Sequence, residues 1–524
     1  MLQACRLQLF CDRLFCLFLI VRAPCPEVSL SGQVPARVWE SAYSQAGFFT
    51  CLQSTSLNLS PATDNLSVTA STSTDSSATR QAHPALQFSI APGGSLRGRL
   101  RVPGDKSISH RSIMLAALAD GETQINGFLE GADSLATLAA FRAMGVTIDG
   151  PAHGQVRVVG VGMNGLSIPI GPLYMGNSGT SMRLLCGLLS GQRFATTLIG
   201  DQSLSRRPMR RVTTPLCKMG ARIETTAQGT APLHIAPAKR LIGIDYPMPV
   251  ASAQVKSSLL LAGLYADGET CVHEPAPTRD HTERMLATLG YEVRRDGERI
   301  CVTGGGKLHA APITVPADIS SAAFFLVGAA IAPGSNLTLE QVGINPTRIG
   351  IINILRAMGA DLRIQRKPDL GAEPVADILI RSAKLNGITI PLEQVPLAID
   401  EFPALFIAAA CAEGQTLLTG AEELRVKESD RIAVMAEGLA ALGVQSVILP
   451  DGIRIEGRGN AAAVFNGGSV HSHDDHRIAM SFAMAGLRAA APIKILDCAN
   501  VNTSFPGFAT LAARAGLAIS EQTR

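Results

Sequence analysis

The chain has 524 residues, of which 46% are hydrophobic, 17% charged and 4% aromatic, and its formal net charge is +3. This length allows roughly two to four domains, and the apolar fraction is ample for large hydrophobic cores. A charge so close to balance lacks the strongly basic profile of nucleic-acid and membrane-surface proteins. The composition predicts an Ala-, Gly- and Leu-rich α/β protein with neither a nucleic acid nor a membrane as partner.

Residues 1–84 read differently from the rest. Residues 14–21 form a short apolar run after two arginines, as in a signal peptide, but the run is too short to span a bilayer. Residues 54–77 are rich in Ser and Thr and have no helical or strand period, which predicts disorder. Three interpretations stay open: a targeting leader, a disordered extension, or a start codon assigned too far upstream. We favour the last two and expect the first strand near Leu86.

The cysteines indicate the redox compartment. Five of the eleven fall in the first 51 residues, and the others are scattered without a CxxC pair. This usage predicts reduced, buried thiols in a cytoplasmic chain, rather than a disulfide framework or a zinc site. The six scattered cysteines are Cys186, Cys217, Cys271, Cys301, Cys411 and Cys498.

The first distinctive element is a strand, a turn and a helix. A strand-like run at 100–102 meets Pro103-Gly104, and a helical run follows over 107–119. Asp105 or Ser107 is expected to cap that helix. Lys106 and Arg111 then lie within about one turn of a helix N-terminus, which favours anions. A capped surface helix with solvated charges is the alternative.

A sequence signature recurs five times along the chain: the end of an apolar helix, then Met or Leu, then Gly, then a strand-like alternation. A weaker sixth copy has Ala before the Gly. We expect a left-handed glycine that ends each helix and turns the chain into a strand. The units, of about 70 residues, exceed ordinary solenoid repeats. Several helices are apolar on nearly every face, so we predict two lobes of three units with helices inside and strands outside. The glycines are Gly145, Gly220, Gly290, Gly359, Gly443 and a weaker Gly516, and the apolar helices are expected at 113–119, 135–144, 184–189, 259–265, 322–330 and 404–412.

Further turns rich in small or cationic residues follow the first one. Taken singly, each also fits an ordinary helix start or a solvated charged loop. The run at 471–477 holds three His and two Asp, but a metal site is disfavoured because no ligand spacing or second ligand cluster fits. These turns occupy 176–183, 200–211, 252–257, 278–281, 422–431 and 471–477.

Together the cations predict a small ligand with several negative charges. Arginines and lysines at so many turns, in a chain of low net charge, suit phosphate and carboxylate groups. The sequence has no Walker A motif and no GxGxxG after a strand, so a nucleotide is not indicated. The cations are Lys106, Arg111, Arg183, Arg207, Arg279, Lys427, Arg431 and Arg477.

Residues 86–520 resemble the 3-phosphoshikimate 1-carboxyvinyltransferases, also called 5-enolpyruvylshikimate-3-phosphate synthases, of the second class. The resemblance implies an α/β fold, a two-lobed inverse α/β barrel of six βαβαββ repeats, three in each lobe. The first lobe would hold 85–103 and 317–524, and the second 104–316. The matching motifs, in order, are GDKSISHR (104–111), GNSGTSMR (176–183), RP (207–208), SAQVKS (252–257), TRDHTE (278–283), IDEFP (399–403), RVKESDR (425–431) and DHRIAM (475–480).

The resemblance also implies an activity. Members transfer the enolpyruvyl (carboxyvinyl) group of phosphoenolpyruvate to the 5-hydroxyl of shikimate 3-phosphate and release phosphate, without a cofactor or metal, in chorismate and aromatic amino-acid biosynthesis. Asp400 would be the base at the 5-hydroxyl, and Glu428 and Lys106 would handle the proton at C3 of phosphoenolpyruvate.

Substrate contacts carry over in the same way. Shikimate 3-phosphate would be held by Lys106, Ser107, Arg111, Ser252, Ala253, Gln254, Arg279, Asp400 and Lys427. Phosphoenolpyruvate would be held by Lys106, Asn177, Gly179, Arg207, Gln254, Arg431 and Arg477, with His476 nearby.

Two positions bear on ligand binding. Thr503 stands where many members carry a lysine, which puts that contact with phosphoenolpyruvate in doubt. Gly179 stands where some glyphosate-tolerant members carry alanine, so glyphosate is an expected inhibitor. The expected partners are small molecules only, and a monomer is favoured.

Two other functions share features with this sequence. The UDP-N-acetylglucosamine 1-carboxyvinyltransferases carry Asn after the first lysine and a mobile loop with a Cys, whereas this chain has Ser107 and no such cysteine. A non-catalytic anion-binding relative would be expected to lack at least one of Lys106, Asp400 and Glu428, and all three are present.

Overall fold

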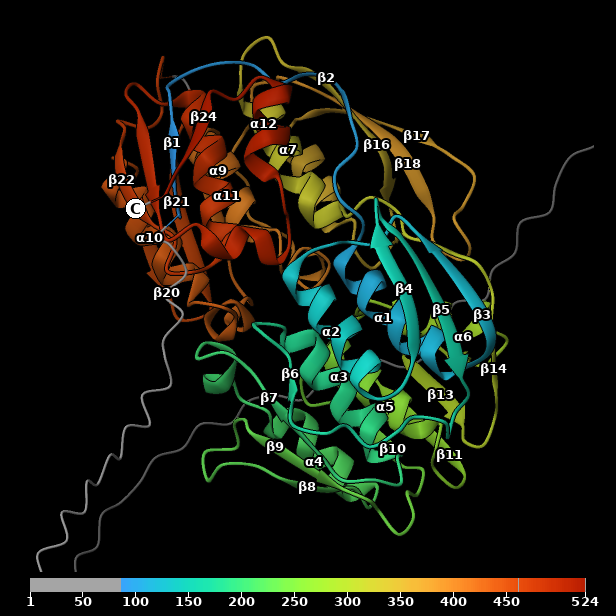
Figure 1. Ribbon diagram of the computed structural model, residues 1–524. Coiled ribbons are helices and arrows are strands. Elements are labelled where there is room, and N and C mark those ends of the chain that lie inside the picture. Colours follow the sequence, from blue (N-terminus) through green and yellow to red (C-terminus); the bar gives the residue numbers. More distant parts are fainter. Residues whose placement is uncertain (1–85, 460, 524) are drawn as a thin grey trace, which may run out of the picture. The chain divides into compact units, whose positions relative to one another are not determined.

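The computed structural model describes residues 86–459 and 461–523 (Figure 1). These residues form twelve α-helices and 24 strands in six sheets, which confirms the predicted α/β class. The first strand begins at Leu86, as expected. The expectations for residues 1–84 lie outside the described residues.

Three sheets contain strands from the start and the last third of the chain. Their strand orders are β22-β23-β1-β24, β17-β18-β16-β2 and β19-β21-β20. The bounds are β1 (Leu86–Ile90), β2 (Arg97–Leu100), β16 (Asn336–Gly343), β17 (Asp361–Arg366), β18 (Val375–Arg381), β19 (Glu413–Leu418), β20 (Ser446–Leu449), β21 (Gly452–Arg458), β22 (Gly468–His471), β23 (Ile493–Leu496) and β24 (Ile519–Thr523).

The other three sheets come from the middle of the chain. Their orders are β14-β3-β5-β4 with β15 also paired to β3, β6-β7-β9-β8, and β10-β11-β13-β12. The bounds are β3 (Ala119–Asn126), β4 (Thr147–Ala152), β5 (Gln155–Val161), β6 (Leu173–Tyr174), β7 (Thr196–Ile199), β8 (Arg222–Glu224), β9 (Leu233–Ala236), β10 (Asp245–Pro247), β11 (Glu269–His273), β12 (Arg294–Asp296), β13 (Arg299–Thr303), β14 (Leu308–His309) and β15 (Ile313–Thr314).

Helices that are mostly or fully buried alternate along the chain with helices that expose one face. All residues of α7 and α9 are buried, as the apolar runs predicted. The prediction was wrong for 135–144, because α2 exposes Ala139, Arg142 and Ala143. The helices are α1 (Lys106–Leu118), α2 (Ala132–Ala143), α3 (Gly179–Ser190), α4 (Arg210–Lys218), α5 (Ala253–Gly263), α6 (His281–Thr288), α7 (Ile319–Ile331), α8 (Gly350–Ala357), α9 (Phe402–Ala410), α10 (Arg431–Ala441), α11 (His476–Ala485) and α12 (Phe508–Ala515).

The six predicted glycine turns are confirmed. Each glycine follows an amphipathic helix and has a positive φ, from 80° at Gly290 to 115° at Gly516. In this conformation a side chain would be strained, so glycine ends the helix and the chain enters an edge strand. In Figure 1 the strands lie outside the buried helices α1, α3 and α5.

Two hydrophobic cores form. One draws on residues 88–102 and 317–517, and the other on residues 108–315. The chain passes between them twice, and the two passages lie side by side: Asp105 N–H donates to Pro316 O (2.8 Å), and Asp318 N–H donates to Pro103 O (2.9 Å). The described helices include none that is both long and apolar enough to cross a membrane.

The prediction that all six scattered cysteines are reduced was wrong. Cys271 on β11 and Cys301 on β13 form a disulfide, because the antiparallel register places them directly opposite each other. Of the others, Cys186, Cys411 and Cys498 are buried, and Cys217 is exposed. A separation of 30 residues gives no sequence signal for this pairing, which depends on the strand register.

We expect the two cysteine-containing peptides to stay linked when the unfolded chain is alkylated and digested without reductant. Closing a loop of this length restricts the unfolded chain and contributes about 3.7 kcal/mol to the free energy of unfolding. Mass spectrometry of the peptides, with and without dithiothreitol, measures the linkage. Separately alkylated Cys271 and Cys301 in the sample without reductant would contradict it.

Candidate active site

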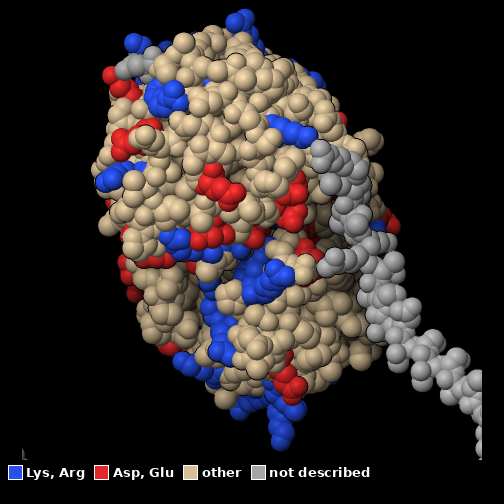
Figure 2. All heavy atoms as spheres, turned by 90° about the vertical axis from the view of Figure 1, so that its left-hand side faces the viewer, with Lys and Arg blue, Asp and Glu red and all other residues tan. Residues whose placement is uncertain are grey.

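A cavity of about 1010 Å³ is lined by residues of both core-forming segments. All the predicted site residues except Arg111 and Asn177 line it. Figure 2 shows Lys and Arg atoms gathered across the middle of one face of the molecule. The predicted residues at the cavity are Lys106, Ser107, Gly179, Arg207, Ser252, Ala253, Gln254, Arg279, Asp400, Lys427, Glu428, Arg431 and Arg477.

Five helices, α1, α3, α5, α10 and α11, begin at this cavity, and the first residue of each lines it. Their free backbone N–H groups and positive dipole ends favour a bound anion. Each cap side chain accepts a hydrogen bond from the first turn, which fixes where the helix begins. The caps are Asp105, Ser178, Ser252, Asp430 and Asp475.

Lys106 stands at the N-terminus of α1. Its Nζ donates to Ser504 Oγ (2.7 Å) and pairs with the carboxylate of Asp133 in the first turn of α2. Burial raises the pKa of Asp133, and Lys106 only partly offsets this rise. The Thr503 hydroxyl donates to Asn500 O, so the side chain at the position of the family's lysine makes a local contact. Its neighbour Ser504 contacts Lys106 instead.

Asp400 lies just before α9, surrounded by cations. It pairs with Arg279, and its carboxylate lies 3.3 Å from Arg431 Nη1 and 3.6 Å from Lys427 Nζ. Burial alone would raise the pKa of Asp400, but Arg279, Lys427 and two further arginines hold it well below its usual range. The group is therefore an ionised carboxylate at neutral pH.

Glu428 faces the same cavity. Its carboxylate oxygens lie 2.5 Å from Arg431 Nη2 and 3.3 Å from Arg207 Nη1. Burial opposes ionisation, but these two arginines hold the pKa of Glu428 well below its usual range. His476, also at the cavity, has its pKa lowered by burial and by Lys106, so its imidazole is neutral.

Arg207 is held from behind by Asn177. Its Nη2 donates to Asn177 Oδ1 (2.5 Å), and Asn177 Nδ2 donates to Asp201 (2.7 Å). Asn177 therefore orients a cavity arginine without lining the cavity itself. Close by, a Cβ added to Gly179 would lie 2.8 Å from Arg183 Nη1 and 3.3 Å from Arg207 Nη1. A glycine here leaves room for the guanidinium groups.

Arg183 and Arg211 extend the cationic wall. Arg183 Nη1 donates to Gln254 Oε1 (2.7 Å), and burial, with repulsion from Arg211 and Arg207, lowers the pKa of Arg183 to about 10. Arg211 pairs with Glu423 (3.0 Å), which joins the two core-forming segments across the cavity.

Two cations lie away from the cavity: Arg111, which was predicted to bind the ligand, and Lys256, which belongs to the motif at 252–257. Arg111 is buried behind Ser107, where its guanidinium donates to Ser107 O (2.9 Å) and to the hydroxyls of Ser257 (2.8 Å) and Thr282 (2.7 Å). Lys256 is fully buried, with its Nζ 2.8 Å and 2.6 Å from the carboxylates of Glu274 and Glu283 respectively. Neither lines the cavity, so Arg111 supports Ser107 here and its contact with substrate stays a prediction.

The histidine-rich run divides between two places. His471 pairs with Asp497 (3.2 Å) and His473 with Glu437 (3.3 Å), whereas His476 lines the cavity. Asp475 is buried and accepts from Arg431 Nε (2.9 Å), so it orients a cavity arginine.

Several cavity residues were missed by the sequence reasoning. Their partners are distant in sequence, and an acidic residue in a first helical turn is common without any site. They include Asp133, Asp318, Ser320 and Arg348.

The family model of EPSP synthase (3-phosphoshikimate 1-carboxyvinyltransferase) matches residues 90–511. The 3-phosphoshikimate 1-carboxyvinyltransferase of Alkalilimnicola ehrlichii is 68% identical over 83% of this chain and 97% of its own length. That of Nitrosococcus oceani is 66% identical over 83% of this chain and 97% of its own length.

Solved structures are also similar to this chain. An EPSP synthase from Acinetobacter baumannii has a TM-score of 0.76 and 59% identity, and the match covers 84% of this chain and all of that one. An enolpyruvyl transferase from Streptomyces tendae, with 18% identity and a TM-score of 0.66 over 84% of this chain and all of that one, shares the fold. The chain belongs to the EPSP synthase (3-phosphoshikimate 1-carboxyvinyltransferase) family.

Proposed function

We propose that the protein transfers the enolpyruvyl group of phosphoenolpyruvate to the 5-hydroxyl of shikimate 3-phosphate and releases inorganic phosphate, in the biosynthesis of chorismate and aromatic amino acids. The observation that carries this proposal is one cavity that holds Lys106, Asp400 and Glu428 among arginines from both core-forming segments. Two anionic substrates need cations on two sides, and the transfer needs proton donors and acceptors between them.

The charges suggest a separate proton-transfer role for each of Lys106, Asp400 and Glu428. The ammonium of Lys106 supplies the proton to C3 of phosphoenolpyruvate, which makes C2 electrophilic. The Asp400 carboxylate accepts the proton of the 5-hydroxyl as its oxygen attacks C2. Glu428 is ionised in this structure, so it suits the second half, in which a proton leaves C3 and phosphate departs.

The substrate contacts follow the predicted groups. Shikimate 3-phosphate would be held by Lys106, Ser107, Ser252, Ala253, Gln254, Arg279, Asp400 and Lys427, with Arg111 behind Ser107. Phosphoenolpyruvate would be held by Lys106, Gly179, Arg207, Gln254, Arg431 and Arg477, with Asn177 orienting Arg207. The helix N-termini at the cavity add backbone N–H donors for both anions.

The architecture proposed is the two-lobed inverse α/β barrel of six βαβαββ repeats. Six sheets and two separate cores support it. The lobes would be 85–103 with 317–524, and 104–316, and the paired passages at Pro103 and Pro316 support this division. A cytoplasmic monomer that takes only small-molecule partners, and needs no cofactor, completes the proposal.

The test is phosphate release from phosphoenolpyruvate with shikimate 3-phosphate as acceptor. UDP-N-acetylglucosamine, offered in its place, is the control for the sister reaction. We expect phosphate release with shikimate 3-phosphate and none with UDP-N-acetylglucosamine. Turnover with the second acceptor would assign the sister activity, and no turnover with either would favour a non-catalytic anion-binding protein.

Glyphosate is expected to inhibit this enzyme, and the Gly179→Ala variant is expected to resist it. The added methyl would press on the guanidinium groups of Arg183 and Arg207 and displace the anion site by a few tenths of an ångström. An added methyl in a packed site costs about 1–3 kcal/mol, which is about fivefold to about 150-fold in the inhibition constant.

Inhibition curves against phosphoenolpyruvate measure this effect. Gly171→Ala is the matched control, because a Cβ there meets nothing within 4 Å. Full activity of the unmodified enzyme at millimolar glyphosate, or equal inhibition of the Gly179→Ala variant, would contradict the prediction.

A further inference from the structure

Arg348 is a buried arginine that neither the sequence reasoning nor the reaction scheme uses. It lies two residues before α8 and is 3% exposed. Its guanidinium faces three carboxylates: Nη1 lies 3.0 Å from Asp105, and Nη2 lies 3.3 Å from Asp318 and 3.9 Å from Glu401. Nη2 also donates to Ser320 Oγ (2.7 Å).

Two of these carboxylates sit where the chain passes between the two cores. Asp105 caps α1 and accepts from Ile108 N–H (2.9 Å), and Asp318 caps α7 and accepts from Ser320 N–H (2.9 Å). The residue after Asp105 is Lys106. The cap that Arg348 holds therefore sets where the ammonium of Lys106 enters the cavity.

The third carboxylate leads to the proposed base. The Ser320 hydroxyl donates to Glu401, and Glu401 directly follows Asp400. Arg477 Nη1 donates to Asp400 O (2.8 Å) and lies 3.7 Å from Glu401. Arg348 is thus linked to Lys106 through Asp105, and to Asp400 through Ser320 and Glu401.

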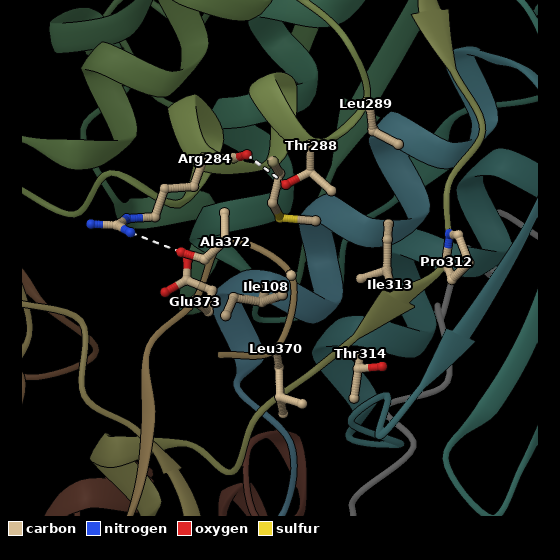
Figure 3. A pocket seen from close by; sticks show the side chains of 12 residues that line it. Ile108, Arg284, Thr288, Leu289, Pro312, Ile313, Thr314, Leu370, Ala372 and Glu373 are labelled. Carbon is tan, nitrogen blue, oxygen red and sulfur yellow. Dashed lines mark hydrogen bonds between the residues drawn. The ribbon is translucent and has the colours of Figure 1, made fainter. Parts of the chain in front are cut away.

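The same arginine contacts the face of α6. His281 Nε2 lies 3.4 Å from Arg348 Nη1, and His281 Nδ1 lies 2.7 Å from Glu373. Glu373 ends the loop between β17 and β18. Figure 3 shows this loop beside α6, around a cavity of about 30 Å³, where Arg284 donates to Ala372 O (2.8 Å). Arg348 is therefore fixed from the α6 side as well.

The charge of Arg348 stabilises the ionised form of these buried carboxylates. Burial would raise the pKa of Asp105, but Arg348 and then His281 hold it below its usual range. Burial and the neighbouring Asp105 raise the pKa of Asp318 to about 6. Without Arg348 these buried carboxylates would lose their main counter-charge. Either the carboxylates would become protonated, or the two chain passages would move apart.

We infer that Arg348 is a positioning residue for the transfer reaction: it holds Lys106 and Asp400 in mutual register through Asp105, Asp318 and the Ser320–Glu401 hydrogen bond. This inference rests on the proposed function. The guanidinium acts through these neighbours, because protein carboxylates and a hydroxyl occupy both of its Nη atoms.

Two variants of the full chain test the inference. Arg348→Lys keeps the charge but cannot bridge both passages, and Ser320→Ala cuts the link to Glu401 without changing the charge. A misplacement of about 1 Å costs about 100-fold, so we expect kcat to fall about 100-fold for Arg348→Lys and about tenfold for Ser320→Ala. We expect the KM for each substrate to change less than threefold, because the binding arginines stay in place.

The control is Arg356→Met, an exposed arginine on α8. Thermal unfolding is measured beside the kinetics, and unchanged kcat with an altered melting temperature would mean a merely structural role. If Arg348→Lys does not fold, Ser320→Ala decides. Unchanged kcat in folded variants would overturn the inference alone, whereas no turnover by the unmodified chain would overturn the proposed function together with it.

Discussion

Replacing Asp400 by asparagine is expected to lower kcat about 1000-fold. A positioned general base contributes about 100-fold to 10,000-fold to a rate, and asparagine keeps the shape of the side chain but accepts no proton at neutral pH. Because Arg279 and Lys427 keep Asp400 ionised against its burial, the base is available throughout the neutral range. Phosphate release at saturating concentrations of both substrates measures the loss.

The Asp400→Asn variant also shows whether Asp400 acts as a base, which would lower kcat, or as a binding group, which would raise KM. The cations around Asp400 lose a counter-charge, so we expect the KM for shikimate 3-phosphate, a dianion at its phosphate, to fall or stay level while kcat falls. Asp361→Asn is the control, because among the described residues this aspartate pairs with Arg363 and Arg381, two partly exposed arginines on β17 and β18. A kcat within threefold of the unmodified enzyme would show that Asp400 is not the base.

Replacing Lys106 by methionine is expected to lower kcat/KM for phosphoenolpyruvate by about 1000-fold or more. The methionine side chain fills nearly the same space but offers neither a proton for C3 nor a charge for the phosphate. The fold is expected to survive, because burial already raises the pKa of Asp133 and this carboxyl can take up a proton when its partner is lost. Single-turnover phosphate release and circular dichroism measure the two effects.

Lys307→Met is the matched control. Lys307 is 74% exposed on its side chain and lies 3.8 Å from Asp120, outside the cavity lining. We expect this variant to keep full activity. If Lys106→Met kept kcat and lost only affinity for phosphoenolpyruvate, Lys106 would bind that substrate without handling its proton, and Glu428 would be the remaining group for that role.

Short stretches of consecutive residues determine where many of the helices of this protein begin and end. A left-handed glycine after a helix is a property of a few consecutive residues, so all six turns were predicted. The sequence also limited the cap of α1 to Asp105 or Ser107, and the structure shows that Asp105 is the cap. Lys106, Arg431 and Arg477 lie in the first turns of α1, α10 and α11, and these helix N-termini lie at the cavity. The other predicted cavity residues came from the motifs of the family resemblance, and all the predicted site residues except Arg111 and Asn177 line the cavity.

Only the tertiary structure decided which charges face the cavity and which neutralise one another. Arg111 and Lys256 have the same sequence signal as Lys106, yet the packing of α1, α5 and α6 buries both beneath the cavity lining. Arg348 meets Asp105 across 243 positions, and Cys271 meets Cys301 through a strand register. Such pairings depend on how distant segments pack, because the energy of an ion pair or a disulfide depends on distance in space rather than on separation along the chain.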